Sequence, residues 1–323
     1  MSTFSGGLMN GRQRPARTRL AAAAAGFTAL IGLAACGTPP PGTGAAPSAG
    51  GSARPSSAPT TAAASPTPTP SPTPTVDQTT LKPGTNHNHA AAAYAYQAKD
   101  VQACLRAKPG EAACPIRKKV VFLTFDDGPT DSTTPKVLDI LKEKGVHGSF
   151  FVIVGPQGME KANPQLVKRE IAEGHSIVIH SYSHSYGLLY PGGRANAQNI
   201  MGDYDKALAG IRKQLGNDYA VRGFRYPGGH GWKGLEASDQ ALAQREAYWM
   251  DWNSNNGDGE SKSAPGSGSA AAERVKSTHR ASGSPEVAVV LMHDYKDNAL
   301  TTGGLAEVID FFKGQGYEFG VVN

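Results

Sequence analysis

From residue 118 onward, short apolar runs alternate with amphipathic stretches along the chain. Residues 120–125 read VVFLTF, a run of β-branched and aromatic side chains that is typical of a buried strand. The next stretch has Pro135 in its first turn and Gly145 just beyond its end, which predicts a helix between them. The first strand and this helix together form one βα unit.

The same pattern repeats to the end of the chain. It predicts further strands at 149–154, 175–180, 221–225, 247–252, 287–292 and 318–322. It predicts further helices at 163–174, 196–215 and 304–313. About seven β-α units in the 206 residues from 118 to 323 indicate an α/β domain with a parallel sheet. Periodicity alone leaves open whether this sheet is open or closed into a barrel.

Glycine and proline, 39 and 23 of 323 residues, are more frequent than in an average globular chain. Residues 254–285 are rich in Gly and Ser, so we expect a long surface loop there. Residues 37–75 contain 11 prolines and a single charge, Arg54. Such a segment cannot bury apolar area, and we expect an extended, polyproline-like spacer, part of which could carry O-linked sugars.

The N-terminus has the pattern of an export signal. Four arginines precede the apolar segment 20–35, as in a secretory leader. The sequence Leu33-Ala34-Ala35-Cys36 resembles a bacterial lipobox, which implies cleavage before Cys36 and lipidation of its thiol. The alternative is an ordinary signal peptide with an incidental cysteine. We divide the chain into a leader (1–35), a lipidated cysteine with a spacer (36–75), an arm (76–116) and a main domain (117–323).

The arm contains the other two cysteines, Cys104 and Cys114. An exported protein permits a disulfide between them, which we favour over two free thiols. We expect Tyr94 and Tyr96 to pack the arm onto the main domain. We expect His87 and His89 to lie in a polar, mobile tail without a role in metal binding.

Net charge excludes one class of partner. The formal charge is +5, but without residues 1–35 the Lys and Arg total falls to 28 against 27 acids. The mature surface is thus not the strongly basic kind that binds nucleic acid.

No apolar run after residue 36 approaches the roughly 20 residues that span a bilayer. We therefore expect membrane contact through the lipid anchor only, and a monomer.

Acidic and imidazole side chains follow the ends of predicted strands, where ligand sites of α/β folds collect. Asp126-Asp127-Gly128-Pro129 follows the first strand. A turn is the simplest interpretation of this string, but two adjacent carboxylates can also point in different directions, one to a metal and one free as a base. His180 and His184 follow the third strand, and a spacing of four residues lets both reach one ion from a single helical turn. Together with an Asp they offer three ligands and leave a position open for water.

Two more strand ends carry candidates for catalysis. His293 ends the strand at 287–292, and it is either a core histidine satisfied by Asp294 or a group that protonates a leaving amine. Arg225 ends the strand at 221–225. It is either a surface cation or a partner that keeps Asp126 ionised and oriented.

The order of these motifs resembles the polysaccharide deacetylases, carbohydrate esterase family 4 or the NodB homology domain. The matching segments are TFDDGP (124–129), HSYSH (180–184), RYPG (225–228) and LMHD (291–294). The resemblance covers about residues 118–323 and implies a distorted (β/α) barrel with a divalent metal, usually zinc. It implies Asp126 as the general base and His293 as the general acid, with Arg225 orienting Asp126. It implies Asp127, His180 and His184 as the metal ligands, and the amide of Gly228 as the oxyanion donor.

The sequence departs from the family in three places. The third motif reads RYPGG where the family has RPPYG, and Val178-Ile179 replaces Gly-Asn before His180. The fourth motif, usually DxxDW, is matched only in part by residues 251–258: Asp258 can correspond to the second carboxylate, but Gly259 replaces the Trp. We therefore expect the carboxylate that tunes His293 to be replaced by Asn255 or supplied by Asp251.

Two tryptophans are candidates for stacking on a sugar. We favour Trp232, which follows the glycines of the third motif. Trp252 fits a core position equally well.

The resemblance and the leader together predict a zinc-dependent enzyme that is anchored to the cell membrane and faces the cell wall. Its substrate would be an acetylated polysaccharide, and its reaction the removal of N-acetyl groups from peptidoglycan amino sugars. One alternative is the deacetylation of chitin oligomers or O-acetyl xylan. The other, of a different class, is a glycan-binding lipoprotein without catalysis, which would not need both a base and an acid.

Overall fold

The computed structural model of this chain describes residues 76–107 and 114–323. The predicted leader (1–35), the lipidated Cys36 and the spacer (36–75) lie outside the described residues. Among the described helices, none combines the length and the apolar character needed to cross a bilayer.

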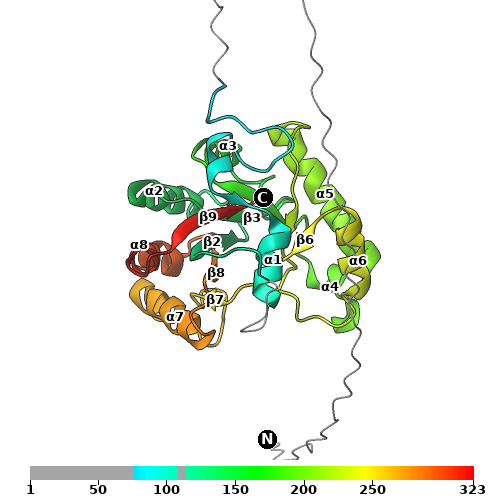
Figure 1. Cartoon of the computed structure of the whole chain (residues 1–323). Coiled ribbons are helices and arrows are strands. Elements are labelled where there is room, and N and C mark those ends of the chain that lie inside the picture. The colour runs from blue at the N-terminus through cyan, green and yellow to red at the C-terminus, as the bar shows by residue number, and fades with distance from the viewer. Residues whose placement is uncertain (1–75, 108–113) are drawn as a thin grey trace, which may run out of the picture. The chain divides into compact units, whose positions relative to one another are not determined.

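A curled parallel sheet forms the centre of the fold (Figure 1). Every ladder between its strands is parallel. The strands are β1 (Ala95–Tyr96), β2 (Val120–Asp126), β3 (Ser149–Ile153), β4 (Ser176–Ser181), β5 (Gly223–Phe224), β6 (Tyr248–Trp249), β7 (Ser254–Asn255), β8 (Val287–His293) and β9 (Glu318–Val322).

The strand order shows how the sheet curls. Seven strands follow one another as β7-β8-β2-β3-β4-β5-β6, and β9 with β1 joins at the start of β2. Strand β8 pairs with β2 along its whole length, from Val120 with Val287 to Asp126 with His293. The end strands β6 and β7 do not pair with each other, so the predicted distorted barrel is confirmed as an open, curled form of it.

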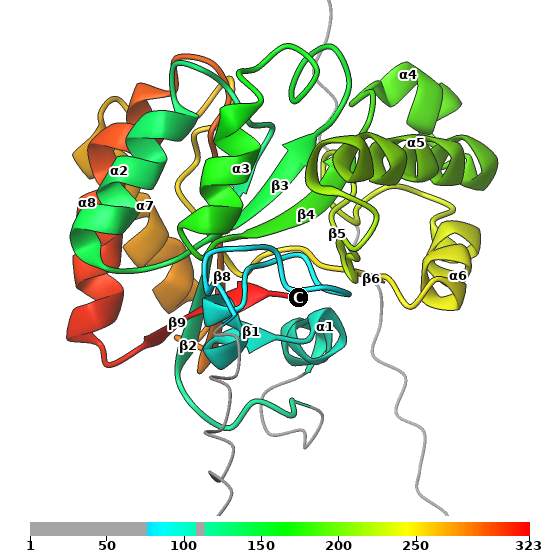
Figure 2. The ribbon, with the colours of Figure 1, turned by 90° about the horizontal axis from the view of Figure 1, so that it is seen from above.

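Helices surround the curled sheet (Figure 2). They are α1 (Ala98–Arg106), α2 (Thr134–Lys144), α3 (Gln165–Ala172), α4 (Tyr186–Leu189), α5 (Ala197–Leu215), α6 (Glu236–Gln244), α7 (Gly268–Ala281) and α8 (Ala299–Gly314), with short 3₁₀ turns η1 (Ala90–Ala93) and η2 (Pro191–Gly193). Helix α2 begins and ends as the sequence predicts: Pro135 lies in its first turn and Gly145 is its left-handed C-cap. Its apolar residues Val137, Leu138 and Leu141 are fully buried.

In the second half of the domain, one prediction was wrong and another was correct in place but too long. Residues 254–285 are not one long loop, because they contain β7 and the 14-residue helix α7. Strands 221–225 and 247–252 are real, but each contributes only two residues to the sheet, as β5 and β6.

The arm is an integral part of the fold. Strand β1 extends the sheet beside β9, and α1 lies against β6 and β8 near the open side of the barrel (Figure 2). As predicted, both tyrosines pack it onto the main domain: Tyr94 stacks on His147, and Tyr96 meets Phe122 edge to face. The prediction of a mobile tail was wrong for His87, which is 1% exposed.

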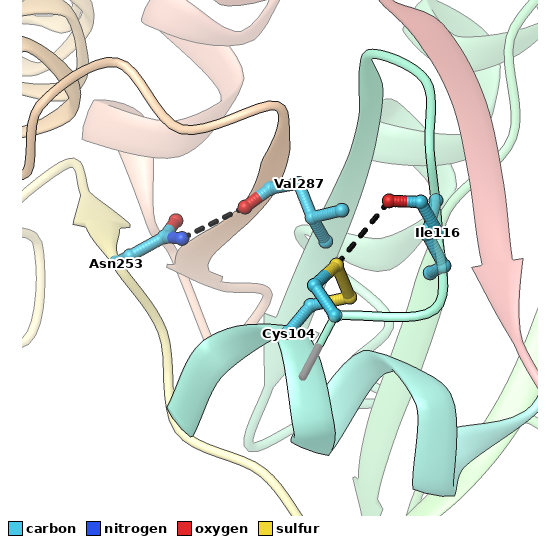
Figure 3. The surroundings of a disulfide bond; sticks show 5 residues. Cys104, Ile116, Asn253 and Val287 are labelled. Atoms are coloured by element: carbon cyan, nitrogen blue, oxygen red, sulfur yellow. Dashed lines mark hydrogen bonds between the residues drawn. A yellow bond between two sulfur atoms is a disulfide. The ribbon is translucent and has the colours of Figure 1, made fainter. Parts of the chain in front are cut away.

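A disulfide joins Cys104 in α1 to Cys114 (Figure 3). The sulfur of Cys114 lies 3.3 Å from the carbonyl oxygen of Ile116, just before β2. Val287, the first residue of β8, lies in the same region, where it accepts a hydrogen bond from the side chain of Asn253. The bridge therefore ties α1 to the segment that leads into β2, close to the first residue of β8.

Candidate metal and catalytic site

The carboxyl ends of β2, β4, β5 and β8 open into one cavity of about 530 Å³. Parallel strands gather their carboxyl ends on one side of a sheet, so segments far apart in the sequence meet there. The cavity is lined by Asp126, Asp127, His180, His184 and His293, together with Tyr186, Tyr226, Gly228, Trp252 and the segment 257–261, among others.

Three side chains converge at the bottom of this cavity. The Nε2 atoms of His180 and His184 lie 3.4 and 3.3 Å from the same oxygen, Oδ1 of Asp127. That oxygen is buried and accepts no hydrogen bond from any residue that the structure describes. His180 Nδ1 donates to the carbonyl oxygen of Arg225 at 2.8 Å, so its Nε2 carries the lone pair that faces the cavity.

This donor set fits a divalent metal. All three ligand atoms lie within 4.8 Å of one another. Two imidazole nitrogens and one carboxylate are a set that binds transition metals with positions left open for water. The described residues therefore place the predicted ligands together, as a possible metal site.

The local backbone differs from the prediction. His180 and His184 do not share a helical turn: His180 is in β4, and His184 lies after the strand with a left-handed φ of 48°. Asp127 is also left-handed, with a φ of 72°, directly after Asp126 at the end of β2. The reversal of the backbone at Asp127 turns its side chain away from that of Asp126.

A carboxylate that sequence reasoning missed holds the turn of the two histidines. Asp203 on α5 accepts hydrogen bonds from Ser181 Oγ (2.6 Å) and from the backbone N–H groups of Tyr182 (2.7 Å) and Ser183 (2.9 Å). It occupies a buried position beside Ile200 and Tyr204 on the apolar face of the helix. An acid within an apolar stripe was the signal that could have indicated its role.

Asp126 faces the same cavity but has a different partner. Its Oδ1 accepts a hydrogen bond from Arg225 Nη1 at 2.6 Å, and its Oδ2 lies 3.8 Å from His180 Nε2. Arg225 is fully buried and donates also to Thr124 Oγ1 and to the carbonyl oxygens of Met250 and Asp251. The surface-cation interpretation of Arg225 is thereby excluded, and the pair is a buried, hydrogen-bonded ion pair.

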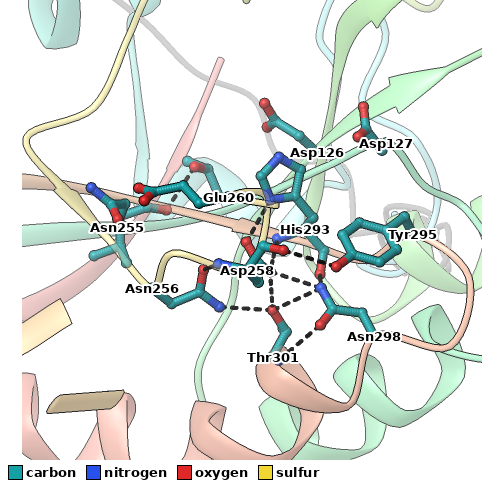
Figure 4. A network of polar contacts seen from close by, with 12 residues as sticks. Asp126, Asp127, Asn255, Asn256, Asp258, Glu260, His293, Tyr295, Asn298 and Thr301 are labelled. Carbon is teal, nitrogen blue, oxygen red and sulfur yellow. Dashed lines mark hydrogen bonds and ion pairs between the residues drawn. The ribbon is translucent and has the colours of Figure 1, made fainter. Parts of the chain in front are cut away.

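His293 ends β8, beside Asp126 of the neighbouring strand β2, and its partner is Asp258 (Figure 4). His293 Nδ1 lies 2.6 Å from Asp258 Oδ1, and the His293 N–H donates to Asp258 Oδ2 at 2.9 Å. Asn298 and Thr301 donate to the same Oδ2 at 2.7 and 2.6 Å. Asp258 is thus fixed by four hydrogen bonds and orients the imidazole.

This pairing corrects the prediction for the fourth motif. Neither Asn255 nor Asp251 contacts His293: Asn255 accepts from Arg274, and Asp251 accepts from the N–H of His230. The prediction failed because Gly259 replaces the Trp of the motif, which left Asp258 as only a partial match to the second carboxylate. With Gly259 next in the chain, the backbone passes close to the imidazole, since a Cβ on Gly259 would lie 2.8 Å from His293 Cε1.

Asp294 is not the partner of His293 either. It is buried, and its Oδ2 accepts from Thr134 Oγ1 at 2.5 Å. Its carboxylate fills the space beside Gly128, where an added Cβ would lie 2.1 Å from Asp294 Oδ2. Asp294 therefore supports the loop that carries Asp126 and Asp127, and the core-histidine interpretation of His293 is excluded.

Charge and burial separate the pKa values of the two groups that flank the cavity. Burial of the ring disfavours the imidazolium, but the hydrogen bond and charge of Asp258 outweigh this and raise the pKa of His293 to about 9. Burial also opposes ionisation of Asp127, but the neighbouring imidazoles of His180, His293 and His184 lower its pKa. His293 can therefore carry a proton at neutral pH while Asp127 is ionised.

The third motif, residues 225–229, contributes Gly228 and Gly229 to the lining of the cavity. Gly228 has a left-handed φ of 77°, and its N–H donates to no residue in the described part of the chain. Trp232, the predicted sugar platform, stacks on Tyr190 with 4.2 Å between ring centroids and is absent from the cavity lining. Trp252 lines the cavity instead, so it is the better placed of the two tryptophans.

Comparison with known proteins points to one family. The family model described as polysaccharide deacetylase matches residues 115–245. A solved structure of a Streptococcus mutans CE4 esterase is 36% identical, with a TM-score of 0.70, and the match covers 77% of this chain and all of that one. The chain is also 30% identical over 206 residues to a bifunctional xylanase/deacetylase of Pseudobutyrivibrio xylanivorans, and 30% identical over 201 residues to a peptidoglycan-N-acetylglucosamine deacetylase of Listeria monocytogenes.

These two curated relatives are longer proteins. The matched segments cover 64% and 62% of this chain but only 30% and 37% of the relatives. The chain thus spans about a third of their length.

Proposed function

The chain belongs to the polysaccharide deacetylase family, carbohydrate esterase family 4, and from this premise we propose that it is a metal-dependent hydrolase that removes N-acetyl groups from cell-wall polysaccharide. The observation that carries the proposal is the single cavity that joins an Asp-His-His metal site to two separate acid–base groups. Asp126, paired with Arg225, and His293, paired with Asp258, both line this cavity. A binding protein would need neither group.

Asp127, His180 and His184 would hold the metal, and zinc suits the two imidazoles and the carboxylate. A divalent cation in this site supplies Lewis-acid polarisation of the acetyl carbonyl and of a water molecule.

Asp126 is the general base. Its Oδ2 faces the metal site, while the bond from Arg225 to Oδ1 keeps the carboxylate oriented toward the attacking water. Asp126 accepts the proton of that water as the water's oxygen adds to the acetyl carbon. The N–H of Gly228, which lines the cavity and has no partner among the described residues, would donate to the developing oxyanion.

His293 is the general acid. Because Asp258 holds the proton on Nδ1, its Nε2–H is free to donate to the departing nitrogen. Cleavage of the C–N bond then releases acetate and an amino sugar.

Peptidoglycan is the substrate we favour, because the Listeria relative is named for it and because the leader and spacer would place the domain at the cell wall. We propose that Cys36 carries the lipid anchor and that the enzyme acts there as a monomer. Acetylated xylan is the second candidate, favoured by the Pseudobutyrivibrio relative that joins a xylanase to a deacetylase.

Acetate release from purified peptidoglycan, with chitin oligomers and acetylated xylan beside it, tests this proposal. The chelated protein should be inactive and should regain activity with Zn²⁺. Release from xylan or chitin alone would support the proposed reaction but contradict peptidoglycan as the substrate. No release from any of them by the zinc-loaded protein would favour the binding-protein alternative.

Substitutions of Asp126 and Asp127 distinguish the proposed general base from the proposed metal ligand. Asp126→Asn should bind Zn²⁺ like the wild type and lose turnover by a factor on the order of 10² to 10⁴, since it removes only the base. Asp127→Asn should lose Zn²⁺ affinity, as measured by titration with a chromogenic chelator. Full activity of Asp126→Asn would refute the assignment of the base.

A further inference from the structure

Two hydrogen-bond donors without partners lie on one wall of the catalytic cavity. One is the N–H of Gly228. The other is the hydroxyl of Tyr186, the first residue of α4, which lines the cavity and makes no hydrogen bond to any residue that the structure describes. A tyrosine hydroxyl that is directed into a cavity without a partner is available to a ligand.

The two donors are close together. A Cβ built on Gly228 would lie 3.4 Å from the Tyr186 hydroxyl oxygen. The Tyr186 ring lies 5.4 Å from the ring of the metal-site residue His184, measured between centroids. The hydroxyl therefore lies beside the predicted oxyanion glycine, on a ring that neighbours the metal-site residue His184.

The position of the Tyr186 ring is held from several sides. Its centroid lies 5.5 Å from that of Trp232 and 6.1 Å from that of Tyr190. The short helix that begins with Tyr186 is capped by Ser185, whose side chain accepts from the N–H of Leu188. Trp232 in turn donates to the carbonyl oxygen of Pro227, next to Gly228. Trp232, which sequence reasoning assigned to sugar stacking, thus supports this wall.

We propose that Tyr186 is a further catalytic residue, whose hydroxyl donates a hydrogen bond to the acetyl oxygen as negative charge develops on it. This inference rests on the proposed deacetylase function. Tyr186 keeps its proton throughout, and it acts beside the amide of Gly228 as a second fixed donor. Donors that are oriented before the reaction stabilise the transition state more than the ground state, so they raise kcat.

The other interpretation of Tyr186 is a platform for a sugar ring. Tyr186 is 47% exposed, and Leu188 on the same helix is 44% exposed, so together they offer an apolar surface at the rim. This surface would need the ring of Tyr186 but not its hydroxyl. Removal of the hydroxyl alone therefore distinguishes the two roles.

The test is Tyr186→Phe in the full-length, Zn²⁺-loaded protein, with kcat and KM measured on the substrate that the wild type deacetylates. Loss of one oxyanion donor costs on the order of 10² to 10³ in kcat, and here we expect at least a tenfold loss with KM unchanged. Zn²⁺ content should equal that of the wild type. Tyr94→Phe is the control, because the hydroxyl of Tyr94 already donates to the carbonyl oxygen of Gly174 and this residue does not line the cavity.

Wild-type kcat in Tyr186→Phe would overturn the proposal. A raised KM in Tyr186→Ala together with a normal Tyr186→Phe would assign the residue to sugar binding instead. Failure of the deacetylase function itself would be seen separately, as absence of acetate release by the wild type.

Discussion

Two adjacent aspartates at the end of β2 acquire different chemistry from their backbone. Asp126 is the last residue of the strand and points to Arg225, whereas Asp127 has a left-handed φ of 72° and points to the two histidines. A left-handed conformation is costly for most residues with a Cβ, but aspartate tolerates it better than most. In the proposed mechanism, this conformation lets two consecutive residues serve as the general base and as a metal ligand.

Asp258 should determine the pH range of the enzyme. It raises the pKa of His293 to about 9, so the imidazolium persists through neutral pH and is lost as the pH rises through this value. Asp258→Asn removes the charge but keeps the size, and the pKa of His293 should fall. We predict that the alkaline limb of the kcat/KM profile moves to lower pH by one unit or more, with a reduced maximum.

The measurement is acetate release across pH 5 to 10 in matched buffers. Asp297→Asn is a suitable control, because this exposed residue lies four positions beyond His293 and pairs only weakly with Lys296, at 3.8 Å. An alkaline limb at the same pH in Asp258→Asn and in the wild type would contradict the assignment of His293 as the acid.

At the scale of elements, the sequence predicts long apolar strands well and small-residue elements poorly. β2, β3, β4, β8 and β9 were found within two residues of their bounds, because burial on both faces produces continuous apolar runs. Helix α7 was missed because its buried face consists mostly of small residues, with Ala271, Ala272 and Val275 in place of large apolar ones. Small residues are needed there, since Gly268 of α7 lies against the backbone of Gly303 in α8.

The predicted site residues lie together because each follows the carboxyl end of a parallel strand, and these ends share one side of the sheet. The sequence motifs mark those strand ends. The supporting residues could not be predicted in the same way. Asp203 and Asp258 act through side-chain hydrogen bonds to segments about 20 and 35 residues away. A local pattern can mark a buried acid, as the apolar stripe of α5 does for Asp203, but it does not show which distant segment that acid contacts.

Asp203 on α5 holds the turn between His180 and His184, so a change at Asp203 should affect metal binding. Asp203→Asn replaces one of the two acceptor oxygens, so at least one hydrogen bond from Ser181, Tyr182 or Ser183 is lost. Loss of such a supporting contact typically weakens metal binding by about 10- to 100-fold. We expect this weakening for Zn²⁺, measured by competition with a chelator, and a proportional loss of activity at limiting Zn²⁺.

Asp205→Asn is the matched control on the same helix. Asp205 is largely exposed and pairs with Arg245 at 3.2 Å, away from the histidine turn. Equal Zn²⁺ affinity in Asp203→Asn and Asp205→Asn would show that the turn does not depend on α5.

At the scale of the whole domain, the open barrel explains why the arm belongs to the fold. The two end strands of the curled sheet leave an unpaired gap, and α1 lies against β6 and β8 there. Gln102 of α1 donates to the carbonyl oxygen of Trp249 in β6 at 2.6 Å. The arm therefore supplies a cover that the β-α units themselves do not provide.

The disulfide should stabilise this cover without affecting the chemistry. It joins residues that are ten apart in the sequence, and closing a loop of that length restricts the unfolded chain by about 2 to 3 kcal/mol. The bridge lies near Val287, where β8 begins, whereas His293 ends the same strand. Six residue steps along a strand correspond to about 20 Å, so the bond is remote from the reacting groups.

We predict that the double substitution Cys104→Ser and Cys114→Ser lowers the melting temperature by about 5 to 10 °C while kcat at 25 °C stays at the wild-type value. Calorimetry of both proteins with and without reductant measures the first effect, and acetate release measures the second. Reductant should bring the wild type to the melting temperature of the variant and should leave the variant unchanged. A fall in kcat together with the melting temperature would contradict this prediction. It would mean that the contacts of the arm affect the catalytic cavity as well as the stability of the fold.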